Sequence, residues 1–96
     1  MSIFDYKGEH MNIVIVVFRA RSHTINFANI LRSYKVPCEI ITTPRKVNVS
    51  CGISVKFNIQ DLSLVEQILS RRNFDTFAGI YQLSGMGNTQ KVIRIK

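Results

Sequence analysis

Residues 38–57 read CEIITTPRKVNVSCGISVKF, and the stretch that organises the fold, residues 43–52, lies between two apolar runs. The runs 38–42 and 53–57 are rich in β-branched or aromatic residues, as strands are. Pro44 has no N–H and a fixed φ, so it ends the first run, and Gly52 can take a positive φ before the second. The pattern predicts two paired strands joined by a long connection.

This connection also holds the cysteine that is best placed for chemistry. Gly52 leaves the Cys51 sulfur sterically open, and Arg45 and Lys46 add two positive charges. Because cationic neighbours and free amides favour thiolate over thiol, Cys51 is the candidate catalytic residue, and Arg45, Lys46 and Gly52 are candidates for stabilising the thiolate or another anion. Thr43, Pro44 and Ser50 are assigned to shaping the loop. The alternatives are a Cys51 that caps a turn and packs inward, and an Arg45 that forms a salt bridge or is simply solvated.

The N-terminal half predicts a strand and a helix. Residues 12–18 form a continuous apolar run, typical of a central strand covered on both faces. A helix would cover one face, and either a partner subunit or the C-terminal tail would cover the other. A helix capped by Ser22 or Thr24 is predicted to reach about Tyr34. Its apolar positions are Phe27, Ile30, Leu31 and Tyr34.

The C-terminal half predicts a strand at 53–57, a helix, a strand at 76–83, a turn at 84–89 and a short edge strand at 91–96. In the strand 53–57, Ile53, Val55 and Phe57 would face the core, whereas Ser54 and Lys56 would point outward. Asp61 is predicted to cap a helix that reaches about Arg72, with Asn73 as its C-cap. The buried face of this helix would be Leu62, Val65, Ile68 and Leu69.

The order β-α-β-β-α-β predicts an α+β protein, a ferredoxin-like βαββαβ sandwich with a four-stranded antiparallel sheet, both helices on one face and scope for an extra C-terminal edge strand. Residues 1–11 are expected to be a flexible leader, 12–83 the ferredoxin-like domain and 84–96 a tail. Cys38 begins the second strand, roughly 13 Å from Cys51 at ~3.3 Å per residue. A disulfide needs Cα atoms closer than about 7 Å, so Cys38 is interpreted as a packing residue.

Composition limits the classes of function. Thirteen Lys and Arg against six Asp and Glu give a net charge of +7, which favours an acidic partner or nucleic acid. Residues 1–10 contain no apolar signal segment, and the longest apolar run is too short to cross a bilayer, so we expect a cytoplasmic protein with reduced thiols and no membrane partner. Two Cys and two His without ligand spacing predict no metal site, and neither His10 nor His23 is assigned a role.

The residues Thr43-Pro44-Arg45 followed by Ser50-Cys51-Gly52, with Val36-Pro37 upstream, resemble the motif of the selenium/sulfur carrier protein-like family of small bacterial proteins. The resemblance covers roughly residues 12–81. It implies that Cys51 carries sulfur or selenium as a persulfide or perselenide. It also implies a donor such as a cysteine desulfurase and an acceptor protein. Such a carrier requires no metal and no organic cofactor, and it need not be a stand-alone enzyme.

Two other classes stay open. A nucleic-acid-binding ferredoxin-like domain would use the basic surface, and Phe77 and Tyr81 could stack bases. Against this class, the outward positions of the strand 53–57 hold no aromatic residue. A non-catalytic interaction or regulatory module is the third class, and the two-faced strand 12–18 suggests a homodimer.

Overall fold

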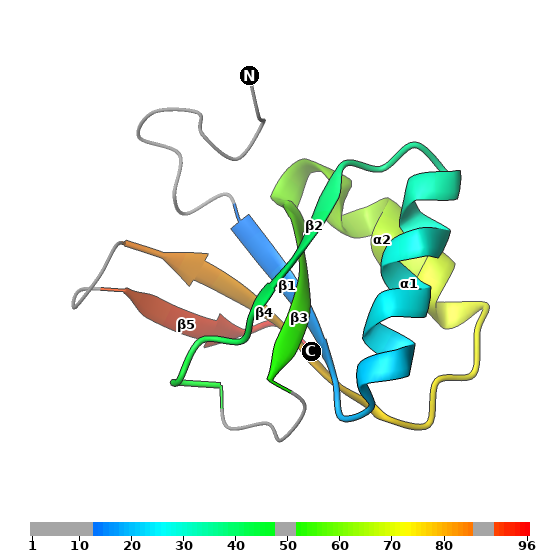
Figure 1. Cartoon of the computed structure of the whole chain (residues 1–96). Helices are drawn as coiled ribbons and strands as arrows, with labels where there is room; N and C mark the ends of the chain where they lie inside the picture. Colours follow the sequence, from blue (N-terminus) through cyan, green and yellow to red (C-terminus); the bar gives the residue numbers. More distant parts are fainter. Residues whose placement is uncertain (1–12, 48–51, 86–89) are drawn as a thin grey trace.

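The computed structural model describes residues 13–47, 52–85 and 90–96 (Figure 1). Within them, two α-helices pack on one five-stranded antiparallel sheet, which confirms the α+β class. The elements in chain order are β1 (Ile13–Phe18), α1 (Arg21–Ser33), β2 (Cys38–Thr42), β3 (Ile53–Asn58), the 3-10 turn η3 (Ile59–Asp61), α2 (Leu62–Ser70), β4 (Phe77–Ser84) and β5 (Lys91–Arg94).

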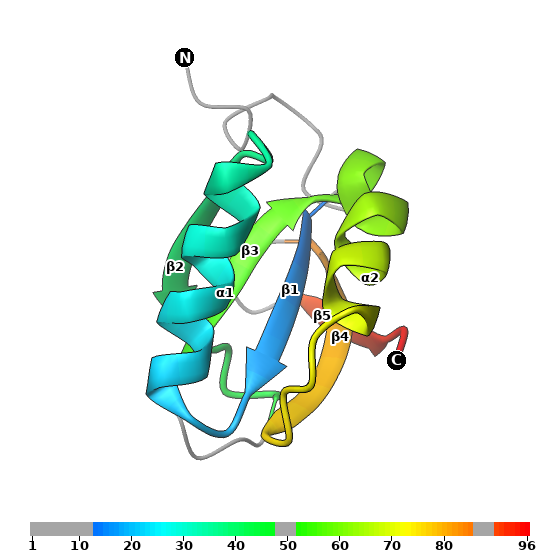
Figure 2. The same cartoon turned by 90° about the vertical axis from the view of Figure 1, so that its right-hand side faces the viewer.

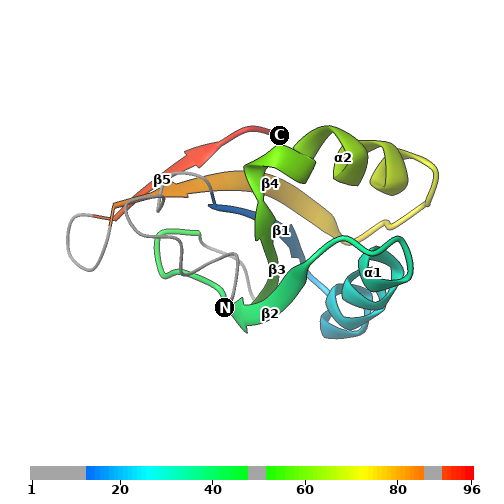
Figure 3. The ribbon, with the colours of Figure 1, turned by 90° about the horizontal axis from the view of Figure 1, so that it is seen from above.

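The strand order of the sheet is β2-β3-β1-β4-β5, with β1 in the centre and antiparallel to both β3 and β4. The sheet has five strands rather than four, because β5 pairs with β4 (Figure 3). The structure therefore does not match the four-stranded βαββαβ prediction, although the extra edge strand lies where it was expected. β5 ends at Arg94, since the amides of Ile95 and Lys96 both donate to the Ile80 carbonyl, at 2.7 and 3.2 Å.

Both helices cover the same face of the sheet, as predicted (Figure 2). β1 contributes Val14, Val16 and Phe18 to the core on this side. The helices contribute the buried residues Phe27, Ala28 and Leu31 from α1 and Val65 and Ile68 from α2. Phe18 lies at the centre of an aromatic cluster, with ring centroids 5.5 Å from Phe27 and 5.1 Å from Phe74.

The β2–β3 connection contributes Val47 to the cover of the opposite face of the sheet. Ile15 and Val17 of β1 are fully buried there, against Val47 of the connection and Leu83 of β4. The prediction that β1 is covered on both faces is confirmed. Val47 of the connection supplies a part of this cover that was not predicted, and Val92 of the C-terminal segment packs in the same cluster.

Ser54 also lies on this second face and is completely buried, so the outward position predicted for Ser54 is wrong. Val55 and Phe57 do face the helices, as predicted, and their neighbours on β3 therefore face the other side. Alternation identified the side of the sheet correctly. It contained no information about the connection that folds over that side.

The N-terminus of α1 differs from the prediction. The helix begins at Arg21, and Ala20 in the N-cap position offers no side-chain cap. Neither Ser22 nor Thr24 is a cap, because both lie inside the helix. The Thr24 hydroxyl instead donates to the Ala20 carbonyl at 3.4 Å, one turn back along the chain.

The C-terminus of α1 is a Schellman motif. Lys35 has φ +62°, its amide donates to Arg32 O at 2.9 Å, and the amide of Val36 donates to Leu31 O at 2.9 Å. Phe27 and Leu31 are buried as predicted, but Tyr34 at the C-cap is 45% exposed and does not belong to the apolar face.

In α2 the predicted apolar face is confirmed, since Val65 and Ile68 are buried and Leu62 and Leu69 pack against the core. Asp61 holds the N-cap position without a side-chain hydrogen bond. The side-chain cap belongs to Asn58, whose Oδ1 accepts from the Gln60 amide at 2.9 Å and starts η3. The helix ends at Ser70 with Arg71 as its C-cap, so the assignment of Asn73 to that position is wrong.

Candidate functional site

Hydrogen bonds hold the two ends of the β2–β3 connection together. The Thr43 amide donates to the Gly52 carbonyl at 2.9 Å, which extends the strand pairing past the end of β2. The hydroxyl oxygens of Thr43 and Ser54 are 2.6 Å apart, and one donates to the other. Because Ser54 is buried, this bond ties the start of the connection to the covered face of β3. Thr43, which was assigned to shaping the loop, therefore lies at the start of the connection and bonds to β3.

The first half of the connection then folds back onto the sheet. The Val47 amide donates to the Pro44 carbonyl at 2.9 Å, forming a turn over Arg45 and Lys46. The Val47 side chain is 4% exposed, and it anchors the turn against Ile15 and Val17. Arg45 and Lys46 remain exposed at the tip of the turn.

The two cations of this turn differ in their surroundings. The Lys46 ammonium donates to the carbonyl of Gln90, just before β5, so Lys46 joins the connection to the β4–β5 hairpin. Arg45 is exposed, and within the described parts of the chain it has no hydrogen-bond or ion-pair partner.

Gly52 closes the connection with a backbone that only glycine adopts easily. Its φ is +85°, and among the described residues other than its chain neighbours, no heavy atom lies within 4 Å of the place where a Cβ would stand. A side chain at this position would be strained even though there is room for it. Gly52 itself is exposed. Cys51 and Ser50 themselves lie outside the described residues, and their assigned roles stay predictions.

Cys38 is a packing residue with a protonated thiol. It is half-buried at the start of β2, opposite Phe57, and its Sγ donates to the Ala28 carbonyl at 3.6 Å. Burial raises the pKa of the Cys38 thiol; the nearby charge of Arg32 opposes this shift, and that of Glu39 adds to it. The predicted separation of Cys38 from Cys51 falls outside the described residues.

The predicted base-stacking pair is not assembled on one face. Phe77 packs with the core under the helices, whereas Tyr81 packs with the cluster on the opposite face. The guanidinium carbon of Arg94 lies 5.8 Å from the centre of the Tyr81 ring and covers part of it. These positions remove the two-aromatic platform that would favour a nucleic-acid-binding sheet.

The side chain of His23 forms a hydrogen bond that links two segments of the fold. Its Nδ1 lies 2.5 Å from the Thr76 hydroxyl, which joins the start of α1 to the segment before β4. Within residues 13–47, 52–85 and 90–96, no group of three His, Cys, Asp or Glu side chains could hold a metal ion. In the same ranges, no helix has the length and apolar character needed to cross a membrane.

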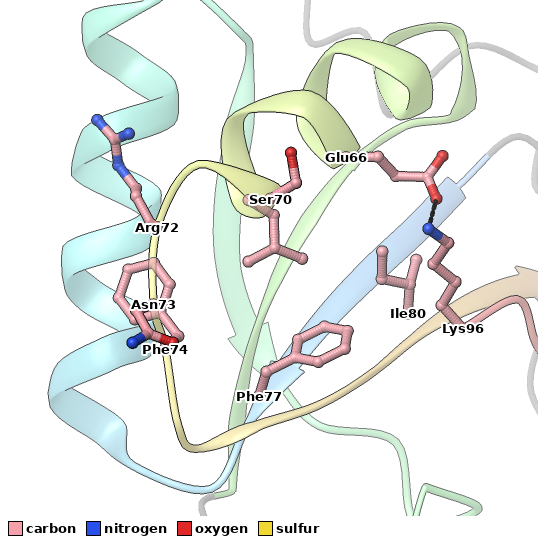
Figure 4. Close-up of a pocket in the computed structure, with 9 residues that line it drawn as sticks. Glu66, Ser70, Arg72, Asn73, Phe74, Phe77, Ile80 and Lys96 are labelled. Atoms are coloured by element: carbon pink, nitrogen blue, oxygen red, sulfur yellow. Dashed lines mark ion pairs between the residues drawn. The ribbon is translucent and has the colours of Figure 1, made fainter.

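A cavity of about 240 Å³ lies on the helix side of the sheet, between α2, the segment before β4, and Lys96 (Figure 4). Its floor is apolar, and an ion pair of 3.1 Å joins Lys96 to Glu66 at its edge. Sequence reasoning missed this cavity, because no local pattern places Lys96 beside α2. The cavity is not part of the connection, since Val47 packs on the other face. The residues that line it are Glu66, Leu69, Ser70, Arg72, Asn73, Phe74, Phe77, Ile80 and Lys96.

The fold defines a small α+β protein whose sequence carries a cysteine motif between two paired strands. The sequence model of the family described as "Putative Se/S carrier protein-like" matches residues 14–82, from β1 into β4. The match spans well over half of the chain, and the protein belongs to this family. No curated protein and no solved structure shows a significant match to the chain.

Proposed function

We propose that the protein is a sulfur or selenium carrier, with Cys51 as the thiol that becomes a persulfide or perselenide. The observation that carries the proposal is the exposed, left-handed backbone of Gly52, which directly follows Cys51 in the sequence. The hydrogen bond from the Thr43 amide fixes the position of Gly52. Family membership supports the same chemistry. A thiol on such a connection could meet a donor protein without entering a cleft.

The transfer step needs no outside oxidant or reductant. The Cys51 thiolate attacks the outer sulfur of a donor persulfide, a new S–S bond forms at Cys51, and the donor's S–S bond breaks. The donor leaves as a thiolate, and the proton stays on the transferred sulfur. An acceptor nucleophile then attacks the outer sulfur on Cys51, the S–S bond at Cys51 breaks, and Cys51 leaves as a thiolate. A perselenide would follow the same steps. The site has no assigned metal or organic cofactor in this scheme.

The exposed guanidinium of Arg45 would stabilise the anionic sulfur before and after transfer, because a fixed cation lowers the pKa of a nearby thiol. Lys46 would act mainly by holding the connection to the carbonyl of Gln90. With a net charge of +7, the chain would favour an acidic donor such as a cysteine desulfurase. The acceptor would be a second protein.

We infer that a ferredoxin-like domain over residues 12–83 carries the site, and that an edge strand in the segment 84–96 extends its sheet. The strand order β2-β3-β1-β4 and the two helices on one face support this frame. A persulfide carrier would act in the reducing cytoplasm, where its thiol stays free of disulfides.

Cyanolysis tests the proposal, because cyanide attacks the outer sulfur of a persulfide and leaves as thiocyanate. Wild-type protein loaded with a persulfide donor and then desalted should release thiocyanate, whereas Cys51→Ser should release none. Cys38→Ser is the matched control and should behave as the wild type. Equal release from Cys51→Ser and the wild type would remove Cys51 from the carrier role.

A further inference from the structure

The sheet has two edges, and they differ in how they resist pairing with another strand. β5 lies at one edge and carries the exposed cations Lys91 and Arg94, a common protection of natural edge strands. β2 lies at the other edge, with the sequence CEIIT and no cation. Proline occurs only beside it, at Pro37 and Pro44, and blocks neither its N–H nor its C=O groups.

Hydrogen-bond alternation identifies the groups of β2 that point outward. Thr43 donates to Gly52, so Thr43 and Gly52 form a hydrogen-bonded pair at the end of the β2–β3 ladder. In an antiparallel ladder such pairs recur at every second residue, so Ile41 and Glu39 also bond to β3. The N–H and C=O groups of the residues between them point away from β3. These outward residues are Cys38, Ile40 and Thr42.

We propose that β2 pairs antiparallel with β2 of a second copy of this chain, about a two-fold axis at Ile40. The outward residues are arranged symmetrically about Ile40, so an identical strand satisfies all of them together. Ile40 would lie opposite the partner's Ile40, and Cys38 opposite the partner's Thr42. The two five-stranded sheets would then form one continuous sheet.

The side chains of β2 fit this pairing. Ile40 is 37% exposed in the single chain, and the two-fold axis would bring the two Ile40 side chains together. Glu39 would lie opposite the partner's Ile41 and keep its own ion pair with Lys56 at 3.6 Å. No like charges would meet across the new strand pair.

The same operation on β5 would be unfavourable. Two of the four residues of β5 are the exposed cations Lys91 and Arg94, and cations on an edge strand oppose its pairing with another strand. β2 is therefore the edge that we assign to the dimer. The pairing leaves Gly52 open, because the antiparallel arrangement places the two β2–β3 connections at opposite ends of the paired strands. The dimer does not depend on the role of Cys51.

Sedimentation equilibrium on three proteins tests the proposal. The wild type should show twice the 11.0 kDa mass of the chain. Ile40→Lys should raise the dissociation constant about tenfold or more, whereas the matched control Ile93→Lys on the other edge should leave the dimer intact. Ile93 is 54% exposed, so both variants place a lysine at an accessible edge position. A monomeric wild type, or dissociation by Ile93→Lys alone, would overturn the proposal.

Amide hydrogen exchange on the wild type gives a second readout that needs no substitution. The amides of Glu39 and Ile41 should be protected at every concentration, since they bond to β3 within one chain. The amides of Cys38, Ile40 and Thr42 should be protected only in the dimer and lose protection on dilution. Fast exchange at those outward amides in a protein of dimeric mass would show that the copies associate through another surface.

Discussion

At the scale of single residues, the backbone takes a left-handed conformation at two positions that matter for different reasons. Gly52 has φ +85° directly after Cys51, where the conformation opens the end of the connection. Lys35 has φ +62° after α1, where the same conformation closes the helix with a Schellman motif. Glycine suits both positions, but the chain uses it only at the first.

Replacing Lys35 by glycine should therefore stabilise the protein. The left-handed conformation is costly for a residue with a Cβ, and glycine removes that cost while adding freedom to the unfolded chain. We expect Lys35→Gly to raise the free energy of unfolding by about 0.5–1 kcal/mol. Urea denaturation measures the change. Lys35→Ala keeps the strain and should give no gain, so equal gains from both variants would contradict the explanation.

The bond between Thr43 and Ser54 allows a double-mutant cycle. Thr43→Val should cost about 1–3 kcal/mol of unfolding free energy, because it leaves the buried Ser54 hydroxyl without its partner. Adding Ser54→Ala to Thr43→Val should recover much of that loss, since no buried hydroxyl is then left without a partner. Strictly additive losses in the double variant would show that the two hydroxyls do not interact.

At the scale of elements, the β2–β3 connection contributes to the cover of the second sheet face. Its anchor is Val47, which packs against Ile15 and Val17 and holds the turn that carries Arg45. The position of the turn and the stability of the sheet therefore depend on the same side chain.

Shortening this anchor should weaken both. Val47→Ala should lower the free energy of unfolding by about 2 kcal/mol, from lost burial and the cavity left behind. Thermal unfolding followed by circular dichroism measures the change. Val92→Ala is the control, since Val92 packs in the same cluster but is only partly buried and should cost less. A smaller effect at position 47 than at 92 would contradict the anchoring role.

The elements also show what could be predicted from the sequence. Alternation in β3 correctly placed Val55 and Phe57 toward the helices, because strand geometry is local. Ser54 was misplaced, because alternation alone does not show that this position is buried and bonded to Thr43. The start of α1 was misplaced by a similar limit: Ser22 and Thr24 are both good caps, yet the helix begins before either.

The candidate site was predictable as a motif but not as an arrangement. The sequence alone distinguished Cys51 from Cys38 through the surrounding charges and Gly52. It could not show that Lys46 contacts the Gln90 carbonyl, because that contact joins segments far apart in the chain. The cavity beside Glu66 and Lys96 was missed for the same reason.

At the scale of the whole molecule, stability should depend on alkaline pH through Cys38. Burial raises the pKa of this thiol in the folded state above its ordinary value of 9.0. The thiol form is favoured by folding, so the contribution is complete below the unfolded pKa and is lost as pH rises through the folded pKa. The free energy of unfolding of Cys51→Ser should fall above about pH 9 by more than that of Cys51→Ser with Cys38→Ala. Parallel pH profiles would contradict the assignment.

Cys51, as the proposed carrier of a transferred atom, is the residue on which the function of the whole molecule would depend. The most direct measurement is intact-protein mass spectrometry after incubation with a cysteine desulfurase and cysteine. We expect the wild type and Cys38→Ser to gain the mass of one sulfur atom, which a reducing agent removes, and Cys51→Ser to gain none. No gain on the wild type, under conditions that load another sulfur carrier, would contradict the carrier function.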